Sequence, residues 1–208
     1  MSTLNAVIDL SHYNPNPDFA AARQDGIVGV IHKATQGTGG IDPTYAATRA
    51  QAQAAGLMWG AYHFATGENP EAQAQHFLAV AGAGPGTLLA LDFEHNPTGP
   101  SMSLDQARAF VTTVQQATGR YPGLYGGSYL KELLGGADPV LAQCWFWLAE
   151  YGPTPHVPAN WPTWTLWQYT DGAFGPEPHE IAGIGRCDRD MFNGDLGQLQ
   201  KLWGVATS

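Results

Sequence analysis

The chain is poor in positive charge. Lys and Arg together number nine in 208 residues, against 18 Asp and Glu, for a formal net charge of -9. No run of basic residues occurs along it, and nucleic acids are bound through clustered cations that contact phosphates. We therefore expect no nucleic-acid partner. Bulk charge cannot attract an acidic polymer either, so such a substrate would have to be held by local contacts.

Cysteine and long apolar runs are also scarce. Cys144 and Cys187 are too few for a disulfide scaffold and lack metal-ligand spacing, which leaves open one disulfide or two buried thiols. No apolar stretch is long enough to span a bilayer, so no membrane partner is expected. The N-terminus lacks a basic start followed by an apolar segment and a small-residue cleavage site, so the sequence predicts no signal peptide.

The apolar residues that are present fall in short runs. A chain of this length suits a single domain, 1–208, that can bury a full core. Runs rich in Val, Ile, Leu and aromatic residues, bounded by turn residues, predict buried strands. Eight such runs occur, at 6–10, 28–32, 59–64, 87–93, 121–125, 144–149, 165–169 and 188–192.

Helix signals follow each of the first five runs. Cap and stop residues predict helices at 18–24, from Asp42-Pro43 to Gly56, from Asn69-Pro70 onward, from Ser103 with its capping-box partner Gln106 to Gly119, and at 128–134. Loops rich in Pro and Gly join the last three runs, and a terminal helix is expected at 197–202. This alternation predicts an α/β barrel whose last strands lack full crossover helices.

The fourth run ends in acidic residues. Side chains alternate between the two faces of a strand, so Leu89, Leu91 and Phe93 should pack against outer helices while Asp92 and Glu94 face the barrel mouth. Carboxylates this close repel each other, which favours one of them holding a proton near neutral pH. A protonated carboxyl group is what a glycosidase uses to protonate a leaving oxygen.

Other polar and aromatic residues stand at the ends of neighbouring runs. Each one alone is more often structural, but their coincidence at the same end of successive strands indicates a site, since that face carries the active site of α/β barrels. The candidates are Asp9, Lys33, Tyr62, His63, Tyr125, Trp167, Tyr169 and Asp188.

These segments, in this order, resemble the family 25 glycoside hydrolases, the Chalaropsis-type lysozymes. The resemblance runs from residue 7 to about 196. It is carried by the segments Val7 to Ser11, Ile31 to Gly37, Gly60 to Phe64, Leu91 to Glu94, Tyr125, Trp147 to Tyr151, Trp167 to Tyr169 and Asp188 to Phe192.

The resemblance implies an irregular TIM-like barrel, (β/α)5(β)3. We expect a single domain, and we expect no wall-binding domain after it, which is a departure from many phage members of the family. The resemblance also implies cleavage of the β-1,4 bond between N-acetylmuramic acid and N-acetylglucosamine in peptidoglycan glycan strands, without cofactor or metal, by a monomer. Glu94 would be the general acid, Asp92 would assist the substrate N-acetyl group, and Asp9 and Asp188 would surround them. Substrate contacts would come from Tyr62, Tyr125, Trp147 and Trp167, with Lys33, His63 and Tyr169 also expected to bind substrate.

The chain departs from the family pattern at two positions. Gln36 stands where the family commonly has Glu, which removes a charge near the expected groove. Asp190 stands where Asn is usual, which leaves a choice between Asp188 and Asp190 for the last acid. Register with the segment Phe192-Asn193-Gly194 favours Asp188.

Several alternatives stay open on the sequence. Asp92 and Glu94 fit either a retaining or an inverting arrangement, and we favour a third route in which the substrate acetamido oxygen is the nucleophile. A catalytically silent sugar-binding module would use the same aromatic and acidic residues. A metal-dependent deacetylase would need ligands such as Asp9, His32 or His63, whose spacing matches no known ligand pattern. Action on the cell wall without a signal peptide points to a phage lysin or non-classical export.

Overall fold

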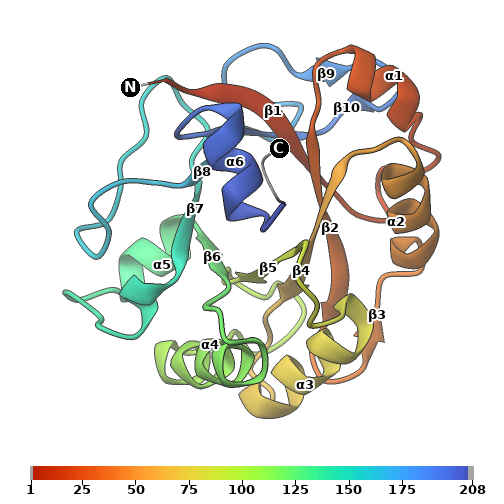
Figure 1. Ribbon diagram of the computed structural model, residues 1–208. Helices are drawn as coiled ribbons and strands as arrows, with labels where there is room; N and C mark the ends of the chain where they lie inside the picture. Colours follow the sequence, from red (N-terminus) through yellow and green to blue (C-terminus); the bar gives the residue numbers. More distant parts are fainter. Residues whose placement is uncertain (1, 206–208) are drawn as a thin grey trace.

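Eight strands close into a barrel in the computed structural model, which describes residues 2–205 (Figure 1). Parallel pairing runs from β1 to β2 and on through β4, β5, β6 and β7 to β8. β11 lies antiparallel between β8 and β1 and completes the ring. The barrel strands are β1 (Leu4–Leu10), β2 (Gly29–Gln36), β4 (Met58–Phe64), β5 (Thr87–Asp92), β6 (Gly123–Gly126), β7 (Trp145–Ala149), β8 (Leu166–Thr170) and β11 (Asp188–Phe192).

A helix follows each of the first five barrel strands. They are α1 (Phe19–Gln24), α2 (Tyr45–Ala54), α3 (Pro70–Ala81), α4 (Leu104–Thr118) and α5 (Ser128–Leu133), and they surround much of the barrel in Figure 1. Between β7 and β8 the chain forms no helix, and between β8 and β11 it forms only a short hairpin. The expected barrel of five β/α units followed by three strands is therefore confirmed.

The predicted starts of two helices differ from those in the structure, and some two-residue strands were not predicted. α2 begins at Tyr45 and not at Asp42, because the Asp42 carboxylate accepts hydrogen bonds from the backbone N–H groups of Thr44 and His12 and so holds a loop. The terminal helix α6 (Leu196–Leu202) begins one residue early, behind an Asp195 capping box. The two-residue strands β3 (Gly40–Ile41), β9 (Glu180–Ile181) and β10 (Gly185–Arg186) were missed, since two residues show no alternation.

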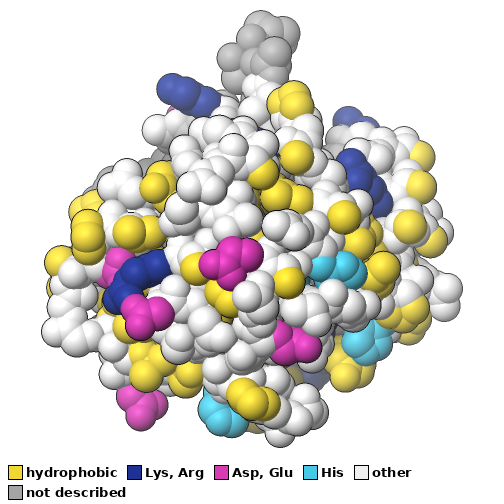
Figure 2. Space-filling model, turned by 90° about the horizontal axis from the view of Figure 1, so that it is seen from below, with side chains coloured by type: hydrophobic (Ala, Val, Ile, Leu, Met, Phe, Trp, Pro, Cys, Tyr) yellow, Lys and Arg dark blue, Asp and Glu magenta, His cyan; other side chains and the backbone are white. Residues whose placement is uncertain are grey.

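Figure 2 shows the side of the molecule that carries α3 and α4. Charged side chains are few on this face and mixed in sign, and its Lys and Arg side chains form no continuous patch. This agrees with the low content of basic residues. Among residues 2–205, no helix has both the length and the apolar character needed to cross a membrane.

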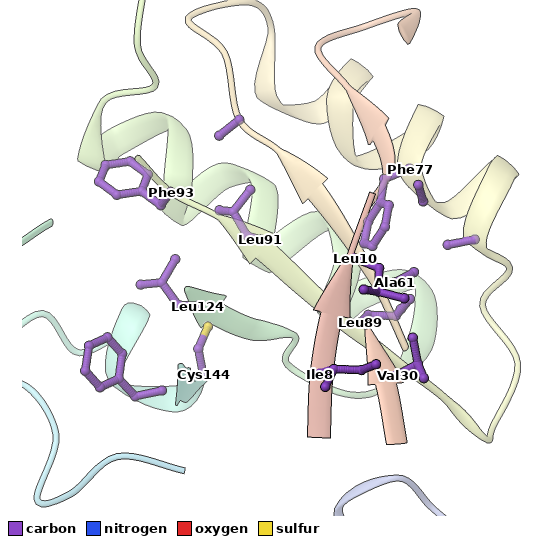
Figure 3. Close-up of a cluster of buried hydrophobic side chains, with 14 of the residues drawn as sticks. Ile8, Leu10, Val30, Ala61, Phe77, Leu89, Leu91, Phe93, Leu124 and Cys144 are labelled. Atoms are coloured by element: carbon purple, nitrogen blue, oxygen red, sulfur yellow. The ribbon is translucent and has the colours of Figure 1, made fainter. Parts of the chain in front are cut away.

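The core has two layers that follow the alternation of side chains along each strand. Outward-facing residues such as Leu89, Leu91 and Phe93 are buried between the barrel and the helices, where they belong to the same cluster as Phe77 of α3 (Figure 3). Inward-facing residues, among them Ala90, form a separate cluster inside the barrel. The prediction that Leu89, Leu91 and Phe93 pack against the outer helices is therefore confirmed.

Both cysteines lie buried and unpaired. Cys144 belongs to the outer layer of the core, as Figure 3 shows, and Cys187 directly precedes β11. Burial raises the pKa of each thiol to about 12. Of the two possibilities left open by the sequence, the structure has the pair of buried thiols, which are unreactive because so little thiolate forms.

α6 and the residue after it close the end of the barrel opposite the strand carboxyl ends (Figure 1). Trp203 has no exposed surface, belongs to the inner core cluster, and donates its indole N–H to the carbonyl of Trp59 at 2.9 Å. Gly29 of β2 makes room for it, because a Cβ at that position would lie 3.3 Å from the indole ring. The terminal helix is thus an integral part of the core.

Ser103 caps α4 as the sequence predicted. Its hydroxyl accepts from the N–H of Gln106, the Gln106 side chain accepts from the N–H of Ser103, and Gly119 ends the helix with a positive φ of 74°. Ser103→Ala should lower the free energy of unfolding by about 1 kcal/mol, because one helix N–H loses its partner. Ser103→Asp keeps an acceptor and should therefore retain most of the stability. Urea titration measures both variants, and equal losses of stability in the two would contradict this prediction.

Candidate active site

A cavity of about 190 Å³ opens at the carboxyl ends of the barrel strands. Four acids and three aromatic residues expected from the sequence line it together, which the strand-end argument anticipated. The lining residues are Asp9, Tyr62, Asp92, Glu94, Tyr125, Trp147, Tyr151, Gln168 and Asp188.

Strand register brings the four acids to this one place. Asp92 is the last residue of β5, and Glu94 follows two positions later on the same inward parity. Asp9 of β1 and Asp188 of β11 are direct partners across the antiparallel pair that closes the barrel. Since β1 and β11 lie far apart in sequence, only barrel closure makes Asp9 and Asp188 neighbours.

Asp92 and Glu94 form an electrostatically strained pair. Burial raises the pKa of Asp92 well above its ordinary value, and repulsion from Glu94 raises it further. Burial also raises the pKa of Glu94, while the positive charge of Lys33 opposes both shifts. The pair therefore retains a proton at a pH where exposed carboxyl groups are ionised. Oδ1 of Asp92 is buried without a hydrogen-bond partner, which adds to the cost of ionising this group.

Gln168 holds the opposite wall of the cavity together. Its Nε2 donates to Oδ2 of Asp9 at 2.8 Å, and its Oε1 accepts from the hydroxyls of Tyr125 at 2.8 Å and Tyr151 at 3.0 Å. The sequence analysis included Gln168 and Tyr151 in the segments that carry the family resemblance but did not predict either as a site residue. Strand parity could have found Gln168, since it lies between the two outward-facing aromatics of β8, but Tyr151 lies in a loop where no periodicity applies.

Asp188 and Asp190 differ in whether they reach the cavity. Asp188 lines the cavity, and burial together with repulsion from Asp171 raises its pKa to about 7. Asp190 has no exposed surface and accepts a hydrogen bond from the indole N–H of Trp147 at 2.6 Å. Asp188 therefore lines the cavity, whereas Asp190 is not part of its lining.

Four residues expected to bind substrate lie outside this cavity, and three of them face the outer layer of the core. His63 faces the outer helices between Phe77 and Phe110, and burial lowers its pKa to about 4. Trp167 and Tyr169 also face outward, and each donates a hydrogen bond to a backbone carbonyl of a loop. The alternation of side chains explains this, because Tyr62 and Gln168 occupy the inward positions next to them.

Lys33 stands beside the acidic cavity rather than on its wall. Its ammonium group donates to Oε1 of Gln36 at 2.7 Å and lies 4.7 Å from the centre of the Phe64 ring. Lys33 and Gln36 line a neighbouring cavity of about 290 Å³. Because Gln36 is neutral, it leaves the positive charge of Lys33 available to Asp92 and Glu94.

A larger cavity of about 660 Å³ continues from the acidic one on the side of β5, β6 and β7. The two cavities share Glu94, Tyr125 and Tyr151, so Glu94 stands at the boundary between them. The larger cavity adds mainly aromatic and neutral lining, including Phe64 and Tyr129. Such walls suit the faces of sugar rings, which stack on aromatic side chains.

The ligands considered for a deacetylase do not come together. Asp9 faces the inside of the barrel, whereas His63 packs against outer helices and His32 stacks on Trp59 of the outer layer. Within the described range, 2–205, no group of three or more His, Cys, Asp and Glu side chains is arranged to hold a metal ion.

An α/β barrel whose mouth combines a proton-retaining carboxyl pair with an aromatic groove is the arrangement that glycosidases of the carboxylate type use. Comparison with known proteins gives the family. The model of glycosyl hydrolases family 25 matches residues 8–176, and the chain belongs to that family.

Relatives cover nearly the whole chain. Lysozyme M1 of Streptomyces globisporus is 32% identical over 214 residues, covering 94% of this chain and 70% of that protein. The N,O-diacetylmuramidase of a Chalaropsis species is also 32% identical, covering 93% and 96%. A crystal structure of a bacterial lysozyme from Streptomyces coelicolor superposes with a TM-score of 0.86 at 31% identity, covering 98% of each chain.

Proposed function

We propose that this glycosidase is an N-acetylmuramidase that hydrolyses the β-1,4 bond between N-acetylmuramic acid and N-acetylglucosamine in peptidoglycan, with Glu94 as general acid. The observation that carries the proposal is the pairing of the buried Asp92 with the half-buried Glu94 at the cavity that Asp9 and Asp188 also line. The names of the relatives, lysozyme and N,O-diacetylmuramidase, support the substrate class.

Glu94 is suited to proton transfer by its position and environment. Burial raises the pKa of Glu94, which favours the protonated form that a general acid presents to the leaving oxygen. Since Glu94 borders both cavities, we infer that the N-acetylmuramic acid ring occupies the acidic cavity and the departing N-acetylglucosamine lies in the larger one. The C–O bond breaks as the proton passes from Glu94 to the oxygen of the departing sugar.

Asp92 is assigned to the substrate acetamido group. The carboxyl group of Asp92, which lines the cavity, accepts the acetamido N–H and so directs the acetamido oxygen at the anomeric carbon as the glycosidic bond breaks. The resulting cyclic oxazolinium ion is opened when water attacks the anomeric carbon and gives its proton to Glu94. Two displacements at one carbon retain the anomeric configuration.

The other lining residues support charge and binding. Asp9 and Asp188 face the anomeric centre as carboxyl groups around developing positive charge, while Tyr62, Tyr125 and Trp147 form the walls. Lys33 tunes the acidic pair electrostatically and lines the adjacent cavity. His63, Trp167 and Tyr169 act in this proposal from the outer face, by anchoring the strands and loops that carry the site.

The identity and configuration of the product test the proposal. Digestion of purified peptidoglycan, followed by borohydride reduction, should place the new reducing ends on muramic acid. Spectra of the digest, taken early and before any reduction, should show the β anomer of the product. New ends on glucosamine would contradict the muramidase assignment, and an initial α anomer would remove the acetamido route. Binding to peptidoglycan without any new reducing ends would instead favour the silent sugar-binding module.

The proposal treats the protein as a monomer whose substrate is the cell-wall glycan. The scarcity of basic residues supports the absence of a nucleic-acid partner.

A further inference from the structure

A third cavity, of about 290 Å³, lies over the carboxyl ends of β2 and β4 and beside the acidic one. It is lined by the end of β2, by β3 and by the loops that follow β1 and β4. Register places Lys33 of β2 next to Tyr62 of β4, which lines the acidic cavity. Because neighbouring strands are about 4.8 Å apart, a substituent on a sugar ring in the acidic cavity can extend to Lys33.

Lys33 is the only Lys or Arg in the lining of this cavity, and its hydrogen-bond partner is neutral. Its ammonium group donates to Oε1 of Gln36 at 2.7 Å and lies over the ring of Phe64. Among residues 2–205, no carboxylate forms an ion pair with it. An ammonium group has three N–H donors, so Lys33 can bind a further acceptor that a ligand brings.

The two carboxylates of this cavity already have donors. Asp42, whose side chain has no exposed surface, accepts from the backbone N–H groups of His12 and Thr44 and from the Thr44 hydroxyl. Glu68 accepts from the N–H and the hydroxyl of Thr38, and these bonds lower its pKa. Both anions are thus satisfied within the protein, while the ammonium group still has N–H donors to offer. The cavity therefore favours a ligand group that is an anionic acceptor.

The sugar assigned to the acidic cavity carries such a group. N-acetylmuramic acid differs from N-acetylglucosamine in a lactyl group that is joined through oxygen to carbon 3 of the ring. This group ends in a free carboxylate, or in an amide to the wall peptide, which bears carboxylates of its own. The methyl group of the lactyl unit suits the side chain of Ile41, which lines the third cavity and is 58% exposed.

We propose that the third cavity binds a carboxylate carried on carbon 3 of the N-acetylmuramic acid ring, and that the neutral Gln36 leaves Lys33 to bind it. Gln36 then determines specificity, because a glutamate in its place would form an ion pair with Lys33 and compete with the substrate. The inference rests on the proposed function for the place of the N-acetylmuramic acid ring.

The electrostatics of Lys33 agree with this assignment. Burial lowers its pKa below the ordinary 10.5, and attraction by Asp92, Asp42 and Glu94 offsets only part of this effect. The ammonium ion is therefore less well stabilised than it would be in water, and a bound carboxylate would restore the difference.

Kinetics of Gln36→Glu on three forms of one glycan preparation test the proposal. The forms are strands with their peptides, strands freed of peptides by an amidase, and peptide-free strands whose carboxyl groups are reduced to alcohols. The variant should raise KM about 10-fold on the forms whose carboxylate Lys33 binds, the effect of losing one hydrogen bond to a charged group. It should leave KM on the reduced strands unchanged. Any change in kcat through the acidic pair should be equal on all three forms.

The pattern across the three substrates decides the outcome. A rise in KM on the peptide-free strands assigns the lactyl carboxylate as the ligand, and a rise confined to the peptide-bearing strands assigns a peptide carboxylate. An equal rise on the reduced strands, or no rise on either carboxylate-bearing form, would overturn the proposal.

Gln53→Glu is the matched control. It adds the same charge on an exposed face of α2, outside all three cavities, and should leave KM unchanged on every form. An effect as large as that of Gln36→Glu would assign the rise in KM to net charge and would also overturn the proposal.

Binding without cleavage separates this inference from the proposed function. In the Glu94→Gln background, calorimetric titration with the same three forms should show the same pattern in Kd when Gln36→Glu is added. The pattern in Kd together with no new reducing ends from the wild type would refute the proposed function and support the carboxylate site. Cleavage of all three forms with an equal effect of Gln36→Glu on each would refute the carboxylate site alone.

Discussion

Glu94→Gln should lower the rate of peptidoglycan cleavage by about 10²- to 10⁴-fold, the contribution typical of a general acid. The amide has nearly the same shape as the carboxyl group and keeps its place between the two cavities, but it cannot deliver a proton to the leaving oxygen. The loss should appear in kcat rather than in KM, because substrate contacts are preserved. Release of reducing ends from purified peptidoglycan at saturating substrate is the measurement.

Glu132→Gln is the matched control for this variant. Glu132 lies on an exposed face of α5, outside both cavities. The variant makes the same carboxyl-to-amide change there and should retain full activity. The pH profile adds a second check. Since Glu94 must be protonated, wild-type activity should fall as pH rises through its raised pKa. Residual activity of Glu94→Gln close to the wild-type level would remove Glu94 from the acid role.

Trp203→Ala should lower the free energy of unfolding by about 3–5 kcal/mol, the range for large aromatic residues truncated in a core. Trp203 fills the end of the barrel opposite the active site, and its removal leaves a cavity against Gly29 and the inner cluster. It also leaves the carbonyl of Trp59 without its indole donor. Urea denaturation followed by circular dichroism would measure the loss.

Two controls separate packing from other effects. Trp203→Phe keeps most of the ring volume and loses the hydrogen bond, so it should cost clearly less than the alanine variant. Phe174→Ala removes an aromatic side chain that is 70% exposed and should change stability by no more than about 0.5 kcal/mol. A Trp203→Ala variant as stable as the wild type would mean that α6 is not part of the cooperative core.

Local patterns predicted much of the fold because they record physical preferences of short segments. The Ser103 capping box and Gly119 mark the two ends of α4 within one stretch of chain. Asp42-Pro43 was misleading, because its carboxylate is bound by His12, a residue 30 positions away. Local signals therefore located elements correctly where the partners were local and failed where a distant residue competed for the same group.

Site residues divide in the same way. Alternation along β5 was enough to turn Asp92 and Glu94 inward, because strand parity is a local property. Along β8, the aromatic residues Trp167 and Tyr169 were predicted to bind substrate, yet Gln168 between them is the residue that faces the cavity. Knowing which face of β8 turns toward the barrel axis would have identified Gln168. The residue types of β8 do not show which face that is, since the residues on both faces are buried.

The sequence by itself determined the family resemblance, the order of strands and helices, and the acidic end of β5. Only the tertiary structure decided that Asp9 pairs with Asp188 and that Asp190 is buried without a donor for one oxygen. It also decided that Gln168 links Asp9 to two tyrosines. The physical reason is barrel closure: pairing β1 with β11 joins residues about 180 positions apart, and the burial that sets their protonation exists only once the ring is complete.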